Sequence, residues 1–132
     1  MTDGSPVGGA KLALSAVAVI ALVAGCVLAP VTADKPKFVT GHPLPPYESF
    51  RECVRLSRDD RLEYSFEASE PVDFDIRYHE GDVVVAPIVR DKSHADAGVF
   101  VARIVRDYCL VWEAGPAGAL VDYRLRLRPA AQ

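Results

Sequence analysis

The chain has 132 residues, of which 50% are hydrophobic and 25% charged, and its formal net charge is −3. This composition is typical of a globular protein and excludes a chain that is disordered throughout. From Asp34 onward, 14 Lys and Arg stand against 17 Asp and Glu, and this mildly acidic balance argues against a nucleic-acid partner, which would require a strongly basic face.

The first predicted element is an apolar stretch from Leu12 to Ala29, which Lys11 precedes. A membrane-spanning helix requires about 20 apolar residues, so the stretch is just long enough to remain as an uncleaved anchor. A cleaved secretory signal is a second interpretation, because "APVTA" ends at Ala33 with the small residues of a cleavage site and Pro30 breaks the helix.

Lipid attachment is a third interpretation of the same segment. The sequence "LVAGC", which ends at Cys26, resembles the lipobox of bacterial lipoproteins, in which an acyl chain is attached to the Cys and the preceding peptide is removed. Residues 12–25 would then form an apolar signal region of the usual length. All three interpretations make residues 1–33 a signal peptide or membrane anchor, and all place the rest of the chain outside the cytoplasm, in the periplasm or at the cell surface.

A proline-rich tether is predicted over residues 34–49. It contains Pro36, Pro43, Pro45, Pro46 and Gly41, which disfavour a helix and most strand pairing. We expect a stiff, partly extended linker that lifts the folded domain off the membrane.

A β-sandwich domain is predicted over residues 50–129. Runs in which apolar and polar residues alternate are typical of half-buried antiparallel strands, and they cover 61–68, 71–79 and 119–129. More continuously apolar runs predict central strands, with Pro87 at a bulge or an edge, and they cover 82–89, 98–105 and 108–114. We therefore predict an all-β fold, an antiparallel sandwich of about seven strands, behind the N-terminal hydrophobic signal or anchor helix.

The three cysteines are Cys26, Cys53 and Cys109. With Cys26 in the signal or anchor, an even pair remains, and outside the cytoplasm such a pair is expected to oxidise. A disulfide between Cys53 and Cys109, which are 56 residues apart in the sequence, would stabilise the fold by about 4 kcal/mol. Two buried free thiols are the alternative. A metal site is less expected, because neither Cys has a second Cys or His two to five residues away.

The domain also resembles a known family. An early Cys is followed by "LEYSFEASEPVDFDIRYHEGD", "AGVFVARI" and "DYCLVWEAGPAGALVDYRLRL", and over about Arg51–Arg128 the chain resembles a GOLD-type domain. The resemblance implies the jelly-roll-like β-sandwich found in the lumenal part of p24 cargo-receptor proteins, with Cys53 and Cys109 as a cross-sheet disulfide. It also implies a domain that binds other proteins or lipids and does not catalyse.

Three residues are candidates for a metal site. His79 and Glu80 lie in the turn "YHEGD" and His94 lies in "DKSHAD", and imidazole and carboxylate ligands suit zinc or copper if the two turns meet. The alternative is that all three are solvated turn residues. No cofactor and no catalytic residue is predicted, because the sequence has no nucleophile elbow G-x-S-x-G and no glycine-rich phosphate loop.

Arg124, Arg126 and Arg128 recur at every second residue and therefore share one side of the last strand. If that strand neighbours the strand of Asp73 and Asp75, the charges pair and form a solvated wall, which is the arrangement we favour. If the strands are not neighbours, the arginines are candidates for binding anionic lipid headgroups or an acidic partner.

The sequence as a whole predicts an exported, membrane-tethered binding module of the bacterial envelope, a lipoprotein that is not an enzyme. Its expected partners are the membrane, through the N-terminal anchor, and an unidentified protein or envelope component. The alternatives are an exported metal-binding protein that uses His79, Glu80 and His94, a secreted soluble domain, and an enzyme of unknown class.

Overall fold

The structure is a computed structural model that describes residues 31–32 and 35–131. The apolar stretch Leu12–Ala29, with Cys26, lies outside the described residues. Among the residues that are described there is no helix, and so none that could cross a membrane. The strands are β1 (Lys37–Leu44), β2 (Ser49–Leu56), β3 (Arg61–Glu80), β4 (Val83–Val101), β5 (Arg106–Ala114) and β6 (Ala119–Arg128).

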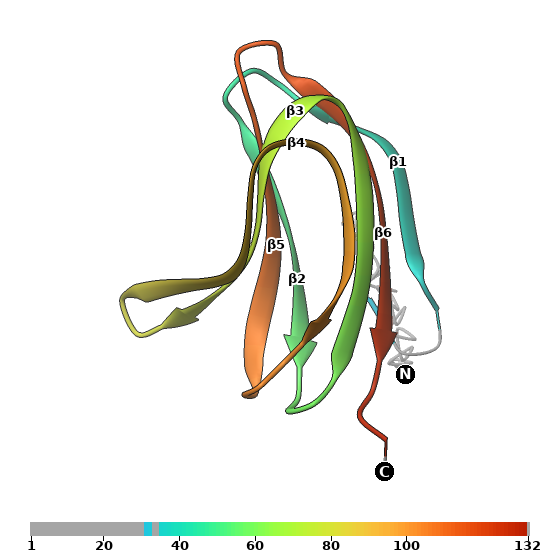
Figure 1. Cartoon of the computed structure of the whole chain (residues 1–132), viewed down its shortest axis with the longest axis vertical. Helices are drawn as coiled ribbons and strands as arrows, with labels where there is room; N and C mark the ends of the chain where they lie inside the picture. Colours follow the sequence, from blue (N-terminus) through green and yellow to red (C-terminus); the bar gives the residue numbers. More distant parts are fainter. Residues whose placement is uncertain (1–30, 33–34, 132) are drawn as a thin grey trace, which may run out of the picture.

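One antiparallel sheet curls on itself to form two facing layers, with the strand order β1-β6-β3-β5-β2. The first half of β3, residues 61–68, pairs with β6, and its second half, residues 72–77, pairs with β5. Strand β4 pairs with β3 along both halves. In Figure 1, β3 and β4 arch together from one layer to the other, and their shared hairpin projects to the left.

The all-β, antiparallel prediction is confirmed, but the sheet has six strands where about seven are predicted. The runs 61–68 and 71–79 are two halves of β3, whereas residues 83–89 and only the first half of 98–105, residues 98–101, belong to β4. The chain crosses between layers through a bulge, because the register passes from Glu67–Ala95 to Val72–Ser93. The backbone N–H of Leu120 donates to Ser69 Oγ at 2.8 Å and holds this bend against β6.

Strand β1 lies inside the predicted tether, so the expectation of a free linker over 34–49 needs correction. Lys37–Val39 and His42–Leu44 pair with β6, and the register shifts between the two segments. Gly41 has a φ of 65° at this shift, which favours glycine. Because β1 is an edge strand, Pro43 can occupy it without breaking a central ladder.

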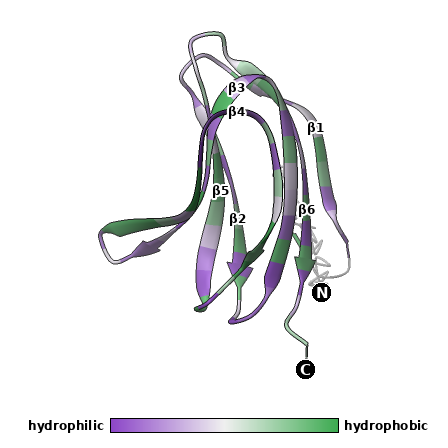
Figure 2. Ribbon diagram, in the orientation of Figure 1, coloured by the Kyte–Doolittle hydropathy of each residue, from purple (hydrophilic) through white to green (hydrophobic). Residues whose placement is uncertain are grey.

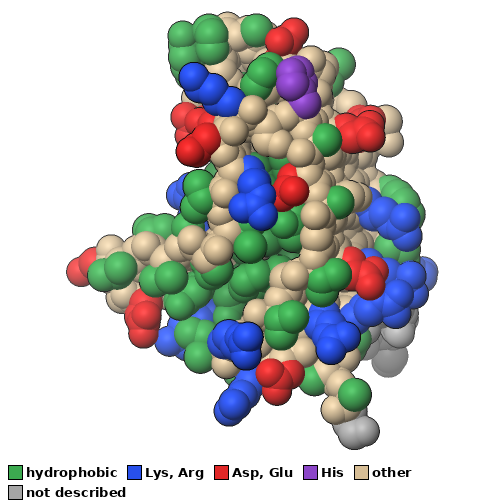
Figure 3. Space-filling model, in the orientation of Figure 1, with side chains coloured by type: hydrophobic (Ala, Val, Ile, Leu, Met, Phe, Trp, Pro, Cys, Tyr) green, Lys and Arg blue, Asp and Glu red, His purple; other side chains and the backbone are tan. Residues whose placement is uncertain are grey.

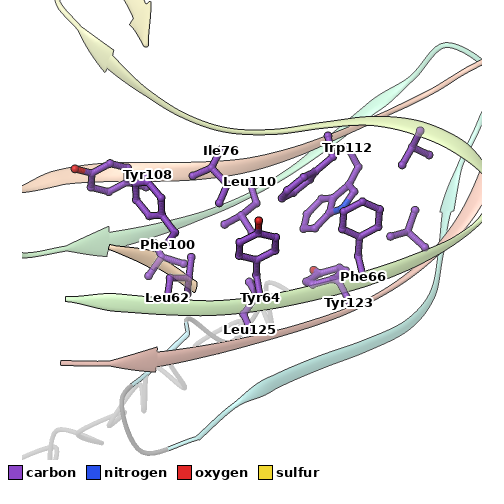
Figure 4. Close-up of a cluster of buried hydrophobic side chains, with 14 of the residues drawn as sticks. Leu62, Tyr64, Phe66, Ile76, Phe100, Tyr108, Leu110, Trp112, Tyr123 and Leu125 are labelled. Carbon is purple, nitrogen blue, oxygen red and sulfur yellow. The ribbon is translucent and has the colours of Figure 1, made fainter. Parts of the chain in front are cut away.

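Aromatic side chains from both layers fill the core, and Figure 4 shows them pointing into the space between the strands. Phe74 in β3 is 1% exposed, and its ring centroid lies 5.5 Å from that of Trp112 in β5. Phe66, in the other half of β3, lies 4.7 Å from Phe74, and Tyr123 of β6 lies 4.7 Å from Trp112. Figure 2 shows the hydropathy alternating along β3 and β6, as the period-two pattern predicts.

A buried polar cluster closes one margin of the sandwich, where β1 and β2 are the edge strands. Glu52 is 7% exposed and accepts hydrogen bonds from Lys37 Nζ at 2.7 Å and from the Tyr123 hydroxyl at 3.1 Å. Burial, together with the Glu52 carboxylate, raises the pKa of Tyr123 and keeps the hydroxyl in its donor form. The cluster therefore joins the two layers through a satisfied ion pair.

The opposite margin is formed by β4, where Arg90 and Asp96 bridge the two halves of the arch at 3.3 Å. The Tyr64 hydroxyl donates to Asp96 at 3.1 Å, and burial, followed by this carboxylate, raises the pKa of Tyr64 to about 12. A Cβ on Gly98 would come within 3.0 Å of the Tyr64 oxygen, so the glycine leaves room for this hydrogen bond.

A disulfide joins Cys53 and Cys109, as the even cysteine pair predicts. The two residues lie directly opposite each other on β2 and β5, which are neighbours in one layer. The bond is therefore a cross-strand link on the outer face, and the cross-sheet position implied by the GOLD resemblance is wrong. The reason is the period of two, which turns Cys53 outward between the inward side chains of Glu52 and Val54.

Candidate functional site

One end of the sandwich, here called the base, is the end at which β2, β4 and β6 finish and β1, β3 and β5 begin. Its two connecting loops are 57–60 and 102–105. Its positive side chains are Arg55, Arg58, Arg61, Arg103, Arg106, Arg126 and Arg128. Its carboxylates are Asp59, Asp60, Glu63 and Asp107, and Lys37 turns inward to Glu52. The base thus carries three excess positive charges on a chain whose net charge is −3, and Figure 3 shows blue side chains gathered at the lower end.

A hollow of about 460 Å³ opens at the base beside the end of β6. It is lined by Asp59, Arg61, Arg126, Leu127, Arg128, Pro129, Ala130 and Ala131. Arg61 and Arg128 lie opposite each other across the β3–β6 ladder, where like charges repel. Arg128 Nε pairs with Glu63 at 2.5 Å, whereas Arg61 and Arg126 form no ion pair with the described residues. The hollow therefore has an unbalanced positive charge, which suits an anion.

The arginine row does not meet the aspartates that the solvated-wall prediction requires. Strand β6 pairs with the first half of β3, whereas Asp73 and Asp75 lie on the second half, which pairs with β5. Asp75 pairs instead with Arg77 on its own strand. The predicted pairing with Asp73 and Asp75 is therefore wrong, and Arg128 pairs with Glu63 instead.

The three arginines of the row have separate surroundings. Arg124 lies above the ring of Phe38, with its guanidinium carbon 4.9 Å from the ring centroid, and it stands two residues before Arg126 on β6. This contact is a cation–π pair. Arg126 and Arg128 lie at the base and line the hollow there.

The loop between β4 and β5 adds apolar side chains to the base. Ile104 is 37% exposed and Val105 is 43% exposed. Backbone hydrogen bonds to the loop 57–60 fix its start, with Asp59 N to Ala102 O at 2.8 Å and Ala102 N to Asp60 O at 3.0 Å. The Tyr108 hydroxyl donates to the carbonyl of Ile104 at 2.7 Å. The sequence pattern predicts a strand over 98–105 and so misses this loop. Arg103 and Arg106, which flank two apolar residues, are the sequence feature that indicates an exposed loop there.

The three metal candidates are not brought together. His79 and Glu80 lie at the tip of the β3–β4 hairpin, where His79 pairs with Val84. His94 lies at the arch, with Nδ1 3.3 Å from the carbonyl oxygen of Ala68. No group of three potential metal ligands occurs within residues 31–32 and 35–131. The described structure therefore does not assemble these three residues into one metal site.

Two further hollows lie on outer sheet faces. One, of about 450 Å³, has a lining that includes Phe38, Ser65, Ala95, Ala97 and Arg124. The other, of about 330 Å³, lies beside the disulfide and is lined by Ser49, Arg51, Arg77, His79, Cys109 and Val111. The lining of the first contains Glu67, Asp96 and Asp122 together with Arg124, and the second is the smaller of the two.

No protein-family model and no curated protein matches the chain. Among solved structures it is similar to the crystal structure of DesR, a β-glucosidase from Streptomyces venezuelae in complex with D-glucose. The TM-score is 0.38 and the identity 11%, over 74% of this chain and 13% of that one. The chain thus spans a small part of that enzyme, and a similarity at this level carries no argument about fold family or activity.

Proposed function

We propose that this protein is an exported, membrane-held binding module of the bacterial envelope, and that its N-terminal segment is processed as a lipoprotein signal with Cys26 acylated. The observation that carries the proposal is the Cys53–Cys109 disulfide. Structural disulfides persist in oxidising compartments and are rare in the cytosol, so the bond supports a location outside the cytoplasm. The apolar stretch Leu12–Ala29, followed at once by the domain, supports attachment at the membrane.

The binding role is part of the proposal. A small sandwich with a charged, partly apolar end offers a surface for recognition, and the arginines of the base supply donors for phosphate or carboxylate groups. We also keep as a proposal the resemblance to GOLD-type domains, which bind proteins or lipids. The all-β sandwich agrees with it, and the same-layer disulfide departs from it.

The mass of the mature N-terminus from native membranes tests this proposal. We expect a chain that begins at Cys26 and carries acyl groups. We also expect that Cys26→Ser abolishes acylation and either releases the protein or leaves it uncleaved. A mature chain beginning at Asp34, or a variant with wild-type processing and membrane retention, would show that the lipoprotein proposal is wrong.

A further inference from the structure

The distance between the apolar stretch and the folded domain is short. The stretch ends at Ala29, and Val31 already packs against the core of the sandwich. Because residues 37–44 form β1, they cannot act as a spacer. An acyl chain on Cys26 would be five residues from Val31, a reach of at most roughly 18 Å. A domain attached in this way stays close to the bilayer.

Strand β1 starts at the base, and the bridge between Thr32 and Lys35 keeps the described part of the N-terminal segment beside that start. Strand β1 starts at Lys37, opposite Leu125, and Arg126 and Arg128 follow within three residues on β6. The end of the domain nearest the attachment point is therefore the end with the basic hollow. Lys35, which is exposed just before β1, adds a further positive charge there.

The opposite end of the sandwich has the reverse charge. Its loops and bends carry Glu48, Glu70 and Asp91, with Lys92 as the cation among them. The domain is thus polarised along its strands, basic toward the attachment point and acidic away from it. Such a distribution orients a domain on an anionic surface, because attraction of the basic end and repulsion of the acidic end both turn the basic end toward the surface.

The loop 102–105 supplies the apolar component that interfacial binding requires. Ile104 and Val105 are exposed between Arg103 and Arg106. Apolar side chains that enter the headgroup boundary and cations that contact the phosphates above it reinforce each other. The loop is held by backbone hydrogen bonds and by the Tyr108 hydroxyl, so its apolar tip is ordered before contact.

From these observations we propose that the base docks on an anionic lipid bilayer. Ile104 and Val105 enter the interface, and the hollow formed by Arg61, Arg126 and Arg128 binds the phosphate of a lipid headgroup. The inference rests on the proposed function, because it assumes that the N-terminal segment brings the domain to a membrane. It adds the ligand class, an anionic phospholipid, and the face that binds it.

The test is fluorescence quenching of the full chain in vesicles made with brominated lipids. An Ile104→Trp variant places an indole at the tip of the base loop, and a matched Leu120→Trp variant places one at the opposite end, where Leu120 is also exposed. Trp112, which is buried, gives the same background in both. In vesicles containing phosphatidylglycerol we expect quenching for Ile104→Trp and none above background for Leu120→Trp.

Charge dependence is the second part of the test. Quenching of the Ile104→Trp variant should fall with added salt and in vesicles of phosphatidylcholine alone, because screening weakens surface electrostatics. Adding Arg61→Glu and Arg126→Glu should weaken docking at least tenfold, since each Lys or Arg near an anionic surface strengthens binding by a factor of about five. Adding Lys92→Glu, at the opposite end of the sandwich, should leave quenching unchanged. Equal quenching of the two Trp variants, or no quenching of either, would overturn the proposal.

Flotation of the same vesicles separates this inference from the proposed function. If the chain floats with the vesicles but Ile104→Trp shows no quenching, the result supports membrane attachment and overturns docking through the base. If the chain does not float, the proposed membrane attachment fails. The soluble chain is then mixed with phosphatidylglycerol vesicles, and salt-sensitive binding through the base is still expected. Absence of that binding would overturn the inference, as would crosslinking of the base to a protein together with no quenching in lipid alone.

Discussion

At the scale of single residues, the least expected feature is the buried ion pair at the β1–β2 margin. Glu52 stands at an inward position of β2, between outward Arg51 and Cys53, and a charge there requires partners. Lys37 and Tyr123 supply them from the other layer. Because Lys37 belongs to the segment predicted as a tether, the sequence gives no sign that it faces Glu52.

Removing Glu52 should destabilise the fold strongly. Its side chain is 8% exposed and that of Lys37 is 12% exposed, so Glu52→Ala leaves a buried ammonium without a partner. We expect a loss of about 3–5 kcal/mol in the free energy of unfolding. Tyr123→Phe removes a single hydrogen bond and should cost about 1 kcal/mol. Urea denaturation measures both, and equal, small losses would mean that the pair is exposed in solution.

Among the elements, the period-two pattern predicts which residues form strands. It does not predict which strands are continuous or which strands pair. The alternation of Leu62, Tyr64 and Phe66 predicts an inward face, which is confirmed. The fusion of two runs into β3 depends on the bend at residues 68–71, where Pro71 signals a break as readily as a bulge. Pairing of β1 with β6 depends on distant residues, which local pattern does not report.

The disulfide is the main covalent link between elements, since it ties β2 to β5. It closes a loop of 56 residues that contains β3 and β4. In the Cys53→Ser, Cys109→Ser double variant we expect a loss of about 4 kcal/mol, because the unfolded chain regains the entropy of the open loop. Urea denaturation of the oxidised wild type beside the variant measures this. An unchanged midpoint, or both cysteines labelled in the denatured, non-reduced wild type, would contradict it.

At the scale of the whole molecule, a nearly neutral composition conceals a polarised surface. The net charge of −3 suggests no anionic partner, yet the base gathers seven arginines from four strands and two loops. The row Arg124, Arg126 and Arg128 is visible in the sequence. Its convergence with Arg61 is not, because that contact depends on the antiparallel pairing of β3 with β6.

Amide hydrogen exchange of the full chain in lipid nanodiscs measures how the domain is oriented on a bilayer. If the base docks on anionic lipid, the amides of residues 57–61 and 102–106 exchange more slowly when the discs contain phosphatidylglycerol than when they contain phosphatidylcholine alone. Residues 45–48 and 115–118, at the opposite end, should exchange equally in both. Identical exchange at the base in the two lipids, or protection at the opposite end, would show that the domain does not dock through the base.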